Sequence, residues 1–86
     1  MIREIEWTIN ARRRLLKRGV SQAEIEAAIR SEHAYRVPNA GDGDWMVPWV
    51  NGSGRRLEVV YDHPVYGDDA FIRVVTVLRI RRAHRW

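Results

Sequence analysis

The chain is best interpreted from the stretch Trp7-Thr8-Ile9-Asn10-Ala11-Arg12-Arg13-Arg14-Leu15-Leu16-Lys17-Arg18-Gly19-Val20-Ser21, which is its most regular and most charged segment. It predicts a helix that begins after Thr8, a suitable N-cap, and ends at Gly19, where a left-handed C-terminal cap is expected. At 100° per residue, one side of this helix is apolar and the other is cationic. The apolar side holds Ala11, Leu15 and Leu16, and the cationic side holds Arg13, Arg14, Lys17 and Arg18. The rest of the chain must supply a partner for the apolar side.

Three polar residues of this helix, Asn10, Arg14 and Arg18, form an i, i+4, i+8 stripe along the border of the apolar side. Arginine side chains can lay their aliphatic stems on a core while their guanidinium groups point into a groove. The stripe therefore has two interpretations, a solvated basic face or a row of ligands in one groove. Both stay open for Arg14 and Arg18, whereas the other cations of the helix fit the solvated face.

Length and composition indicate one soluble domain that spans residues 1–86. Hydrophobic residues make up 45% of the chain and charged residues 30%, as in ordinary globular proteins. Cysteine is absent, which excludes disulfides and thiolate metal sites or nucleophiles. No run approaches the ~18 apolar residues of a membrane span, and the N-terminus lacks the apolar core of a signal peptide. We therefore expect a cytoplasmic protein with no membrane partner.

The net charge of +4 and the pI of about 10.3 come almost wholly from arginine, because Lys17 is the only lysine. Guanidinium groups bind phosphate and carboxylate in bidentate fashion, so this bias suits a nucleic-acid or carboxylate partner, although a GC-rich genome produces the same bias. Residues 1–20 and 79–86 are basic, whereas the middle of the chain is acidic. If the two ends meet in space, they form a positive patch that attracts a polyanion in a salt-dependent way.

A second helix is predicted directly after the first. Ser21-Gln22-Ala23-Glu24 is a capping box, and Val20 and Ile25 are placed to form a hydrophobic staple. The helix is expected to run to about Arg30 and to bury Ile25, Ala28 and Ile29. Because two short amphipathic helices cannot bury each other's apolar faces, a sheet must complete the core.

The remaining segments predict strands and loops. We expect an extended lead-in over residues 2–7, a short strand over 33–37, and a loop over 38–44 that lacks the full ligand set of a calcium site. Residues 45–50 predict a strand that Pro48 places at an edge or a bulge, 51–54 a hairpin turn, 55–62 a central strand and 63–69 a second loop. The expected fold class is α+β, with two N-terminal helices packed on a three- to four-stranded, mainly antiparallel sheet.

The last predicted strand, residues 71–80, is the longest and the richest in β-branched side chains. Strict alternation gives it one core face and one partly charged outer face. The core face would hold Ile72, Val74, Leu78 and Ile80, and the outer face Arg73, Val75, Val77, Arg79 and Arg81.

Two arginine-rich segments are candidates for chemistry. In residues 79–86, His84 lies among arginines whose like charge lowers the imidazole pKa and keeps the ring neutral, as a general base requires. A disordered basic tail is the other interpretation. Of Arg55 and Arg56, at most one can join the charged face of the last strand, because adjacent strand residues point to opposite faces.

Aromatic residues and the other histidines give weaker indications. Exposed indoles of Trp45, Trp49 and Trp86 would stack on bases. The core is the favoured place for Trp7, Trp45 and Tyr61, because large rings bury much apolar area. His33 and His63 lie in or near loops without metal-ligand spacing, so we expect no metal and no cofactor.

The chain resembles the small bacterial DUF4258 family in Thr8-x-Asn10-Ala11-x-x-Arg14-Leu15-x-x-Arg18-Gly19-Val20-Ser21, followed by the strands at Val59–Tyr61 and Val74–Val77. That family typically shows Thr-x-His-Ala-x-x-Arg-Met-x-x-Arg-Gly-Ile there. It is similar in turn to RelE/ParE-like toxins of toxin–antitoxin modules, and Ile5-Glu6-Trp7 with Lys17-x-Gly19-Val20 is also similar to BrnT toxins. The resemblance covers roughly residues 5–80.

The resemblance implies a RelE/ParE-like two-layer fold and a type II toxin that cleaves RNA without metal, is held inactive by a cognate antitoxin protein, and can associate with the ribosome. In such ribonucleases the ribose 2′-OH attacks the adjacent phosphate, so the protein supplies a base, an acid and cations. By this resemblance His84 is the acid–base residue. The expected phosphate or RNA ligands are Asn10, Arg14, Arg18, Arg79 and Arg81, to which we add Arg56.

One position departs from the family pattern, since Asn10 stands where the family has histidine. Asparagine cannot exchange a proton at neutral pH. Either His84 therefore supplies the acid–base chemistry or the protein is not a nuclease. Two alternatives stay open: a noncatalytic module that binds nucleic acid or a partner, and a ParE-like toxin that acts on a protein target such as gyrase.

Overall fold

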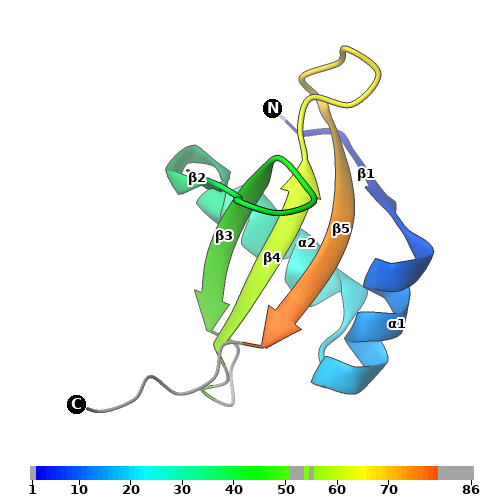
Figure 1. Cartoon of the computed structure of the whole chain (residues 1–86), viewed down its shortest axis with the longest axis vertical. Helices are drawn as coiled ribbons and strands as arrows, with labels where there is room; N and C mark the ends of the chain where they lie inside the picture. Colours follow the sequence, from blue (N-terminus) through cyan, green and yellow to red (C-terminus); the bar gives the residue numbers. More distant parts are fainter. Residues whose placement is uncertain (1, 51–53, 55, 80–86) are drawn as a thin grey trace.

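The computed structural model describes residues 2–50, 54 and 56–79, which form a sheet with two helices packed on it (Figure 1). The elements are β1 (Glu4–Trp7), α1 (Ile9–Arg18), α2 (Gln22–Glu32), the 3₁₀ turn η1 (His33–Tyr35), β2 (Val37–Pro38), β3 (Trp45–Val50), β4 (Arg56–Asp62) and β5 (Phe71–Arg79). The sheet has five strands in the order β1-β5-β4-β3-β2, with β1 parallel to β5 and the other neighbours antiparallel. The α+β class is confirmed, but the sheet is mixed and larger than expected.

Helix α1 begins and ends where the capping residues predict, and α2 begins where its capping box predicts but runs to Glu32, two residues beyond the expected end near Arg30. The Thr8 hydroxyl accepts the Ala11 N–H, and Gly19 adopts the left-handed conformation with φ 66° and donates its N–H to Leu15. Ser21 and Glu24 form both hydrogen bonds of the predicted capping box. These signals are local, so tertiary packing leaves them unchanged.

The segment before α1 differs from the prediction, because Glu4–Trp7 is an edge strand rather than an extended lead-in. It pairs in parallel with β5, from Glu4 opposite Phe71 to Trp7 opposite Val74. The two helices therefore follow a strand and are not at the N-terminus of the fold. No local pattern indicates this strand, since its partner lies more than sixty residues away and only Trp7 is buried.

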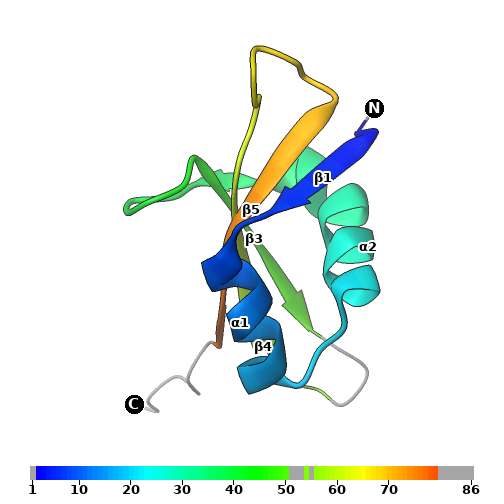
Figure 2. The same cartoon turned by 90° about the vertical axis from the view of Figure 1, so that its right-hand side faces the viewer.

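The core lies between the sheet and the helices (Figure 2). Its sheet side comes from Trp7 and from alternate residues of the three long strands, and its helix side comes mainly from α2. The main buried residues are Trp7, Ala11, Val20, Ile25, Ile29, Val47, Leu57, Val59, Tyr61, Ile72, Val74 and Val77. The predicted core positions of Trp7 and Tyr61 are confirmed, and Trp45 and Trp49 are partly buried against the same cluster.

The opposite face of the sheet is partly covered by the loop between β2 and β3 (Figure 1). Gly43 lies in this loop with φ 96°, and a Cβ built on it would be 2.5 Å from Cγ1 of Val60. Val60 is 1% exposed although it points away from the helices. The predicted loop is therefore a cover for Val60. The strand expected at residues 33–37 is instead η1 followed by the two-residue β2.

A β-bulge in β5 changes the predicted alternation. Val60 pairs with Thr76 and Tyr61 with Val74, so Val75 is an extra residue on β5. A bulge reverses the side-chain phase beyond it. Consequently Val77 is fully buried and Leu78 is 36% exposed, the reverse of the prediction for these two residues.

The strand that contains Pro48 has the predicted edge character, because β2 pairs only with Trp45 and Met46 of β3. The hairpin turn expected at 51–54 lies outside the described residues except for Gly54. Among the helices of the described part of the chain, none is long and apolar enough to cross a membrane.

Candidate functional site

Helix α1 closes the free edge of β5, and the predicted stripe takes part in this contact. Strand β1 pairs with β5 only as far as Val74. Beyond that point the Val75 carbonyl accepts hydrogen bonds from the Thr8 hydroxyl at 3.0 Å and from Nδ2 of Asn10 at 3.3 Å. The Val77 carbonyl accepts from Nε of Arg18 at 3.3 Å. Thr8 and Asn10 thus satisfy the Val75 carbonyl and Arg18 the Val77 carbonyl along the edge that β1 leaves unpaired.

We call α1 together with the Val75 and Val77 carbonyls the helix edge. Because α1 lies beside the sheet, it buries only Ala11 fully, and Leu15 packs partly on the core. Leu16, predicted on the apolar side, is 88% exposed, and Ile9 is 73% exposed. The helix edge therefore presents a wide outer surface to solvent.

The outer surface of the helix edge is strongly basic. Helix α1 contains no acidic residue and ends with Lys17 and Arg18. Among the described residues, the salt bridges join Arg3 to Asp68, Arg30 to Glu26 and Arg73 to Glu6. Four cations of α1 take part in none of them: Arg12, Arg13, Arg14 and Lys17.

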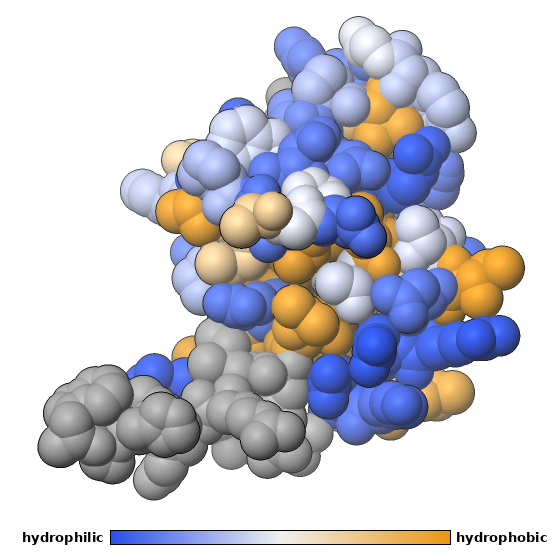
Figure 3. Space-filling view, in the orientation of Figure 1, coloured by the Kyte–Doolittle hydropathy of each residue, from blue (hydrophilic) through white to orange (hydrophobic). Residues whose placement is uncertain are grey.

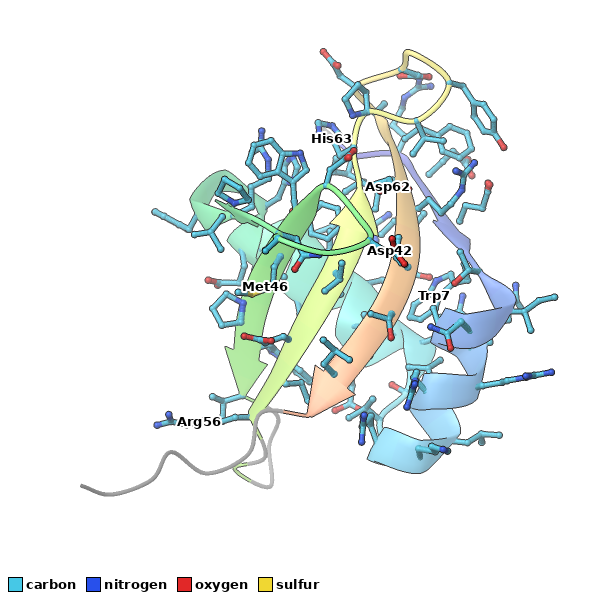
Figure 4. All side chains as sticks on the ribbon, viewed as in Figure 1. Trp7, Asp42, Met46, Arg56, Asp62 and His63 are labelled. Atoms are coloured by element: carbon cyan, nitrogen blue, oxygen red, sulfur yellow. The ribbon has the colours of Figure 1, made fainter. Side chains whose placement is uncertain are left out.

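The other predicted site residues lie either at the end of the sheet next to the last turn of α1 or outside the described residues. Arg56 is exposed and begins β4, at the end opposite to His63 (Figure 4). Arg79 ends β5, where its backbone pairs with Leu57. The Arg18 contact with Val77 brings the last turn of α1 beside this end of β5. Arg81 and His84 lie outside the described residues.

A second group of residues gathers at the other end of β4, around two histidines. His33 follows α2, and His63 follows β4. Their imidazole rings meet edge to face with centroids 4.6 Å apart. They line a cavity of about 420 Å³, which we call the histidine pocket. Its lining residues are Ile2, His33, Arg36, Trp45, His63, Pro64 and Asp69.

The histidine pocket is fixed to the core through backbone and aromatic contacts. Tyr61 is fully buried in β4, and its hydroxyl lies 2.8 Å from Nδ1 of His33. Asp44 accepts the backbone N–H of His63, and Nε1 of Trp45 donates to the His63 carbonyl. The two histidines are therefore held by β3, β4 and the end of α2.

Hydrogen bonding assigns opposite roles to the two imidazoles. Nε2 of His63 lies 2.7 Å from the Asp69 carbonyl, which can only accept, so Nε2 carries the proton and Nδ1 keeps a lone pair. Burial raises the pKa of Tyr61 to about 12, so its phenol remains protonated and donates to Nδ1 of His33. Burial, and then the charge of Arg36, lower the pKa of His33 to about 4. The neutral His33 ring then carries its proton on Nε2.

Arg36 supplies a fixed cation in the histidine pocket. Its guanidinium carbon lies 4.4 Å from the centre of the Trp45 ring, and Nη1 donates to the His33 carbonyl at 3.0 Å. Its Nε is buried and has no hydrogen-bond partner among the described residues. Stacking on the indole and the bond to His33 together hold the guanidinium in place.

The sequence spacing of His33 and His63 is unlike that of metal ligands, and it gives no sign that the two rings meet. No three His, Asp or Glu side chains in the described part of the chain gather as metal ligands. The available signal was positional, since His33 directly follows a helix and His63 directly follows the central strand. If α2 packs along β4 in the same direction, the residues that follow the two elements lie close together.

Comparison with protein-family models, with curated proteins and with solved structures finds no match for this chain.

Proposed function

We propose that this protein binds RNA through the helix edge and acts as the toxin component of a type II toxin–antitoxin module, as a metal-independent RNA endonuclease in which the 2′-OH attacks the adjacent phosphate. The main support for RNA binding is the set of four α1 cations without an acidic partner among the described residues. Such charges keep their full attraction for an external polyanion.

The arrangement of α1 on the sheet also supports this proposal. Hydrogen bonds of Thr8, Asn10 and Arg18 to β5 fix the helix, so its outward cations lie on a rigid surface. In the space-filling view, the surface over α1 is largely hydrophilic and is interrupted by a few apolar patches (Figure 3). Guanidinium groups on such a surface suit phosphate oxygens, which accept paired hydrogen bonds.

The proposed partners follow from the same surface. A cognate antitoxin would have to cover positive charge as well as the exposed Ile9 and Leu16, so an acidic protein segment with apolar residues is the expected kind. The ribosome would offer RNA phosphate to the same cations. This proposal places the protein in the cytoplasm, where both partners are found.

Salt-dependent binding of a single-stranded RNA oligonucleotide tests the proposal. Each phosphate contact to a single strand contributes about −0.7 to the slope of log K against log salt. The triple variant Arg12→Gln, Arg13→Gln, Lys17→Gln should therefore reduce the slope by about 2. Arg30→Gln, which removes a cation from the exposed surface of α2, is the matched control and should leave the slope unchanged.

Two outcomes would contradict the proposal: no RNA binding by the natural chain, or the same slope in the triple variant. Inducible expression then tests the toxin activity, which predicts growth arrest with fragmented RNA. Binding without any product in the presence or absence of EDTA would favour the noncatalytic module instead.

A further inference from the structure

The histidine pocket combines a proton acceptor, a proton-bearing hydrogen-bond donor and a fixed cation. His63 offers the lone pair of Nδ1, His33 offers Nε2–H, and Arg36 offers its guanidinium group. All three side chains line the same cavity. Phosphodiester cleavage without a metal uses a base for the attacking hydroxyl and a cation and hydrogen-bond donors for the phosphate oxygens, and these groups are present here.

We propose that the histidine pocket is the catalytic centre of RNA cleavage, with His63 as general base, Arg36 as the cation on the reacting phosphate and His33 as a hydrogen-bond donor. This inference rests on the proposed function, because it names the site at which the bound RNA is cut. It places catalysis at the end of β4 opposite to Arg56 (Figure 4).

The cavity lining limits the reaction class. It includes no serine, threonine, cysteine or lysine, so no hydroxyl, thiol or amine of the described lining serves as the nucleophile. A hydroxyl that His63 deprotonates can then come from the substrate, and under the proposed function it is the ribose 2′-OH of RNA. A volume of about 420 Å³ fits one nucleotide, since small-molecule pockets span roughly 300–1,000 Å³.

The proposed step balances without a further reactant. Nδ1 of His63 removes the 2′-OH proton, and the 2′ oxygen forms a bond to phosphorus while the bond from phosphorus to the 5′ oxygen breaks. Water in the open cavity protonates the leaving 5′ oxygen, and His63 returns its proton to solvent. The guanidinium of Arg36 and Nε2–H of His33 stabilise the charge on the phosphorane oxygens. The products are a 2′,3′-cyclic phosphate and a 5′-hydroxyl.

The carboxylates near the histidine pocket are compatible with the binding of a single nucleotide there. Asp44 binds the backbone N–H of His63, and Asp62 binds the backbone N–H of Asp44, so both stabilise the loop. Asp69 is also a lining residue, and a carboxylate at this position can accept a hydrogen bond from a base amino group. The cations that hold the rest of the RNA lie on the helix edge.

Cleavage of a labelled single-stranded RNA in EDTA by the full chain and two variants tests the inference. His63→Gln can still donate to the Asp69 carbonyl but cannot accept a proton, so it should reduce the cleavage rate ~10²–10⁴-fold while RNA affinity and its salt slope stay unchanged. Arg36→Gln should also reduce the rate, whereas Arg30→Gln, outside the pocket, should not. In His63→Gly, added imidazole should restore part of the activity, which a purely structural role of His63 would not allow.

The results separate this inference from the proposed function. RNA binding by the natural chain with no cleavage overturns the pocket assignment and leaves the binding proposal intact. Cleavage of RNA by His63→Gln at the rate of the natural chain also overturns the assignment. If only His84→Gln loses the cleavage activity, the general base lies in the C-terminal segment. Circular dichroism of each variant shows whether a lost rate reflects a lost fold, and imidazole rescue of His63→Gly then decides the outcome.

Discussion

The helix edge and the histidine pocket place charged groups in opposite physical settings. At the helix edge, most of the cations come from ten consecutive residues and point to solvent from a helix that buries only Ala11 fully. In the histidine pocket, His33 and Arg36 come from the turn after α2 and His63 from the loop after β4, and they contact Tyr61, Trp45 or one another. Substitutions of exposed side chains at the helix edge should have little effect on the stability of the fold. The pocket residues contact Tyr61 and Trp45, which also pack in or against the core.

This difference suggests a division of work within the proposed function. Exposed cations attract and hold a polyanion without a fixed geometry, because their contribution depends mainly on charge. Proton transfer needs defined tautomers and distances, which the carbonyl of Asp69 and the hydroxyl of Tyr61 provide. Binding and chemistry should therefore respond separately to mutation.

The largest expected change in the free energy of unfolding comes from removing the residue that joins the histidine pocket to the core. Tyr61→Ala removes a fully buried ring and should lower the free energy of unfolding by about 3–5 kcal/mol. The control at the helix edge is Leu16→Ala, which removes an 88% exposed side chain and should change it by less than about 0.5 kcal/mol. Urea unfolding followed by circular dichroism measures both, and equal losses would contradict the comparison.

A smaller effect on the free energy of unfolding is expected from a substitution in the loop between β2 and β3. This loop covers Val60 and carries Asp44, which binds the backbone N–H of His63. Gly43→Ala places a Cβ 2.5 Å from Val60 in a backbone with φ 96° and should destabilise the fold by about 1–3 kcal/mol. Because Asp44 follows and holds His63, the substitution should also shift the His63 imidazole resonances in NMR spectra.

Gly41→Ala is the matched control for this loop. A Cβ at Gly41 has its nearest neighbour at 3.9 Å, an ordinary van der Waals contact, so the fold should keep its stability. Similar free energies of unfolding for the two variants would show that Gly43 does not lie as close to Val60 as described.

The parts of this molecule that sequence could predict are those specified by neighbouring residues. Thr8, Gly19 and the pair Ser21–Glu24 determine the helix ends through contacts within a few residues. Strand β1 and the β5 bulge depend on partners far along the chain, so the alternation that placed Leu78 inside and Val77 outside could not detect the extra residue at Val75. The same limit applies to the site. The cations of α1 are adjacent in sequence, whereas the contact between His33 and His63 exists only after α2 packs beside β4.

The last expected effect depends on pH and comes from adding one proton to the histidine pocket. Burial, and then the charge of Arg36, lower the pKa of His33 from 6.5 to about 4 on folding. The unfolded chain therefore binds more protons than the folded chain between these values, so the stabilising contribution is present above pH 6.5 and is lost as the pH falls toward 4. The midpoint of urea unfolding should decline over this window more steeply in the natural chain than in His33→Gln, which cannot titrate there. Equal slopes in the two proteins would show that His33 is not held neutral by the pocket, and the assignment of Nδ1 as the acceptor of the Tyr61 hydroxyl proton would then fail at low pH.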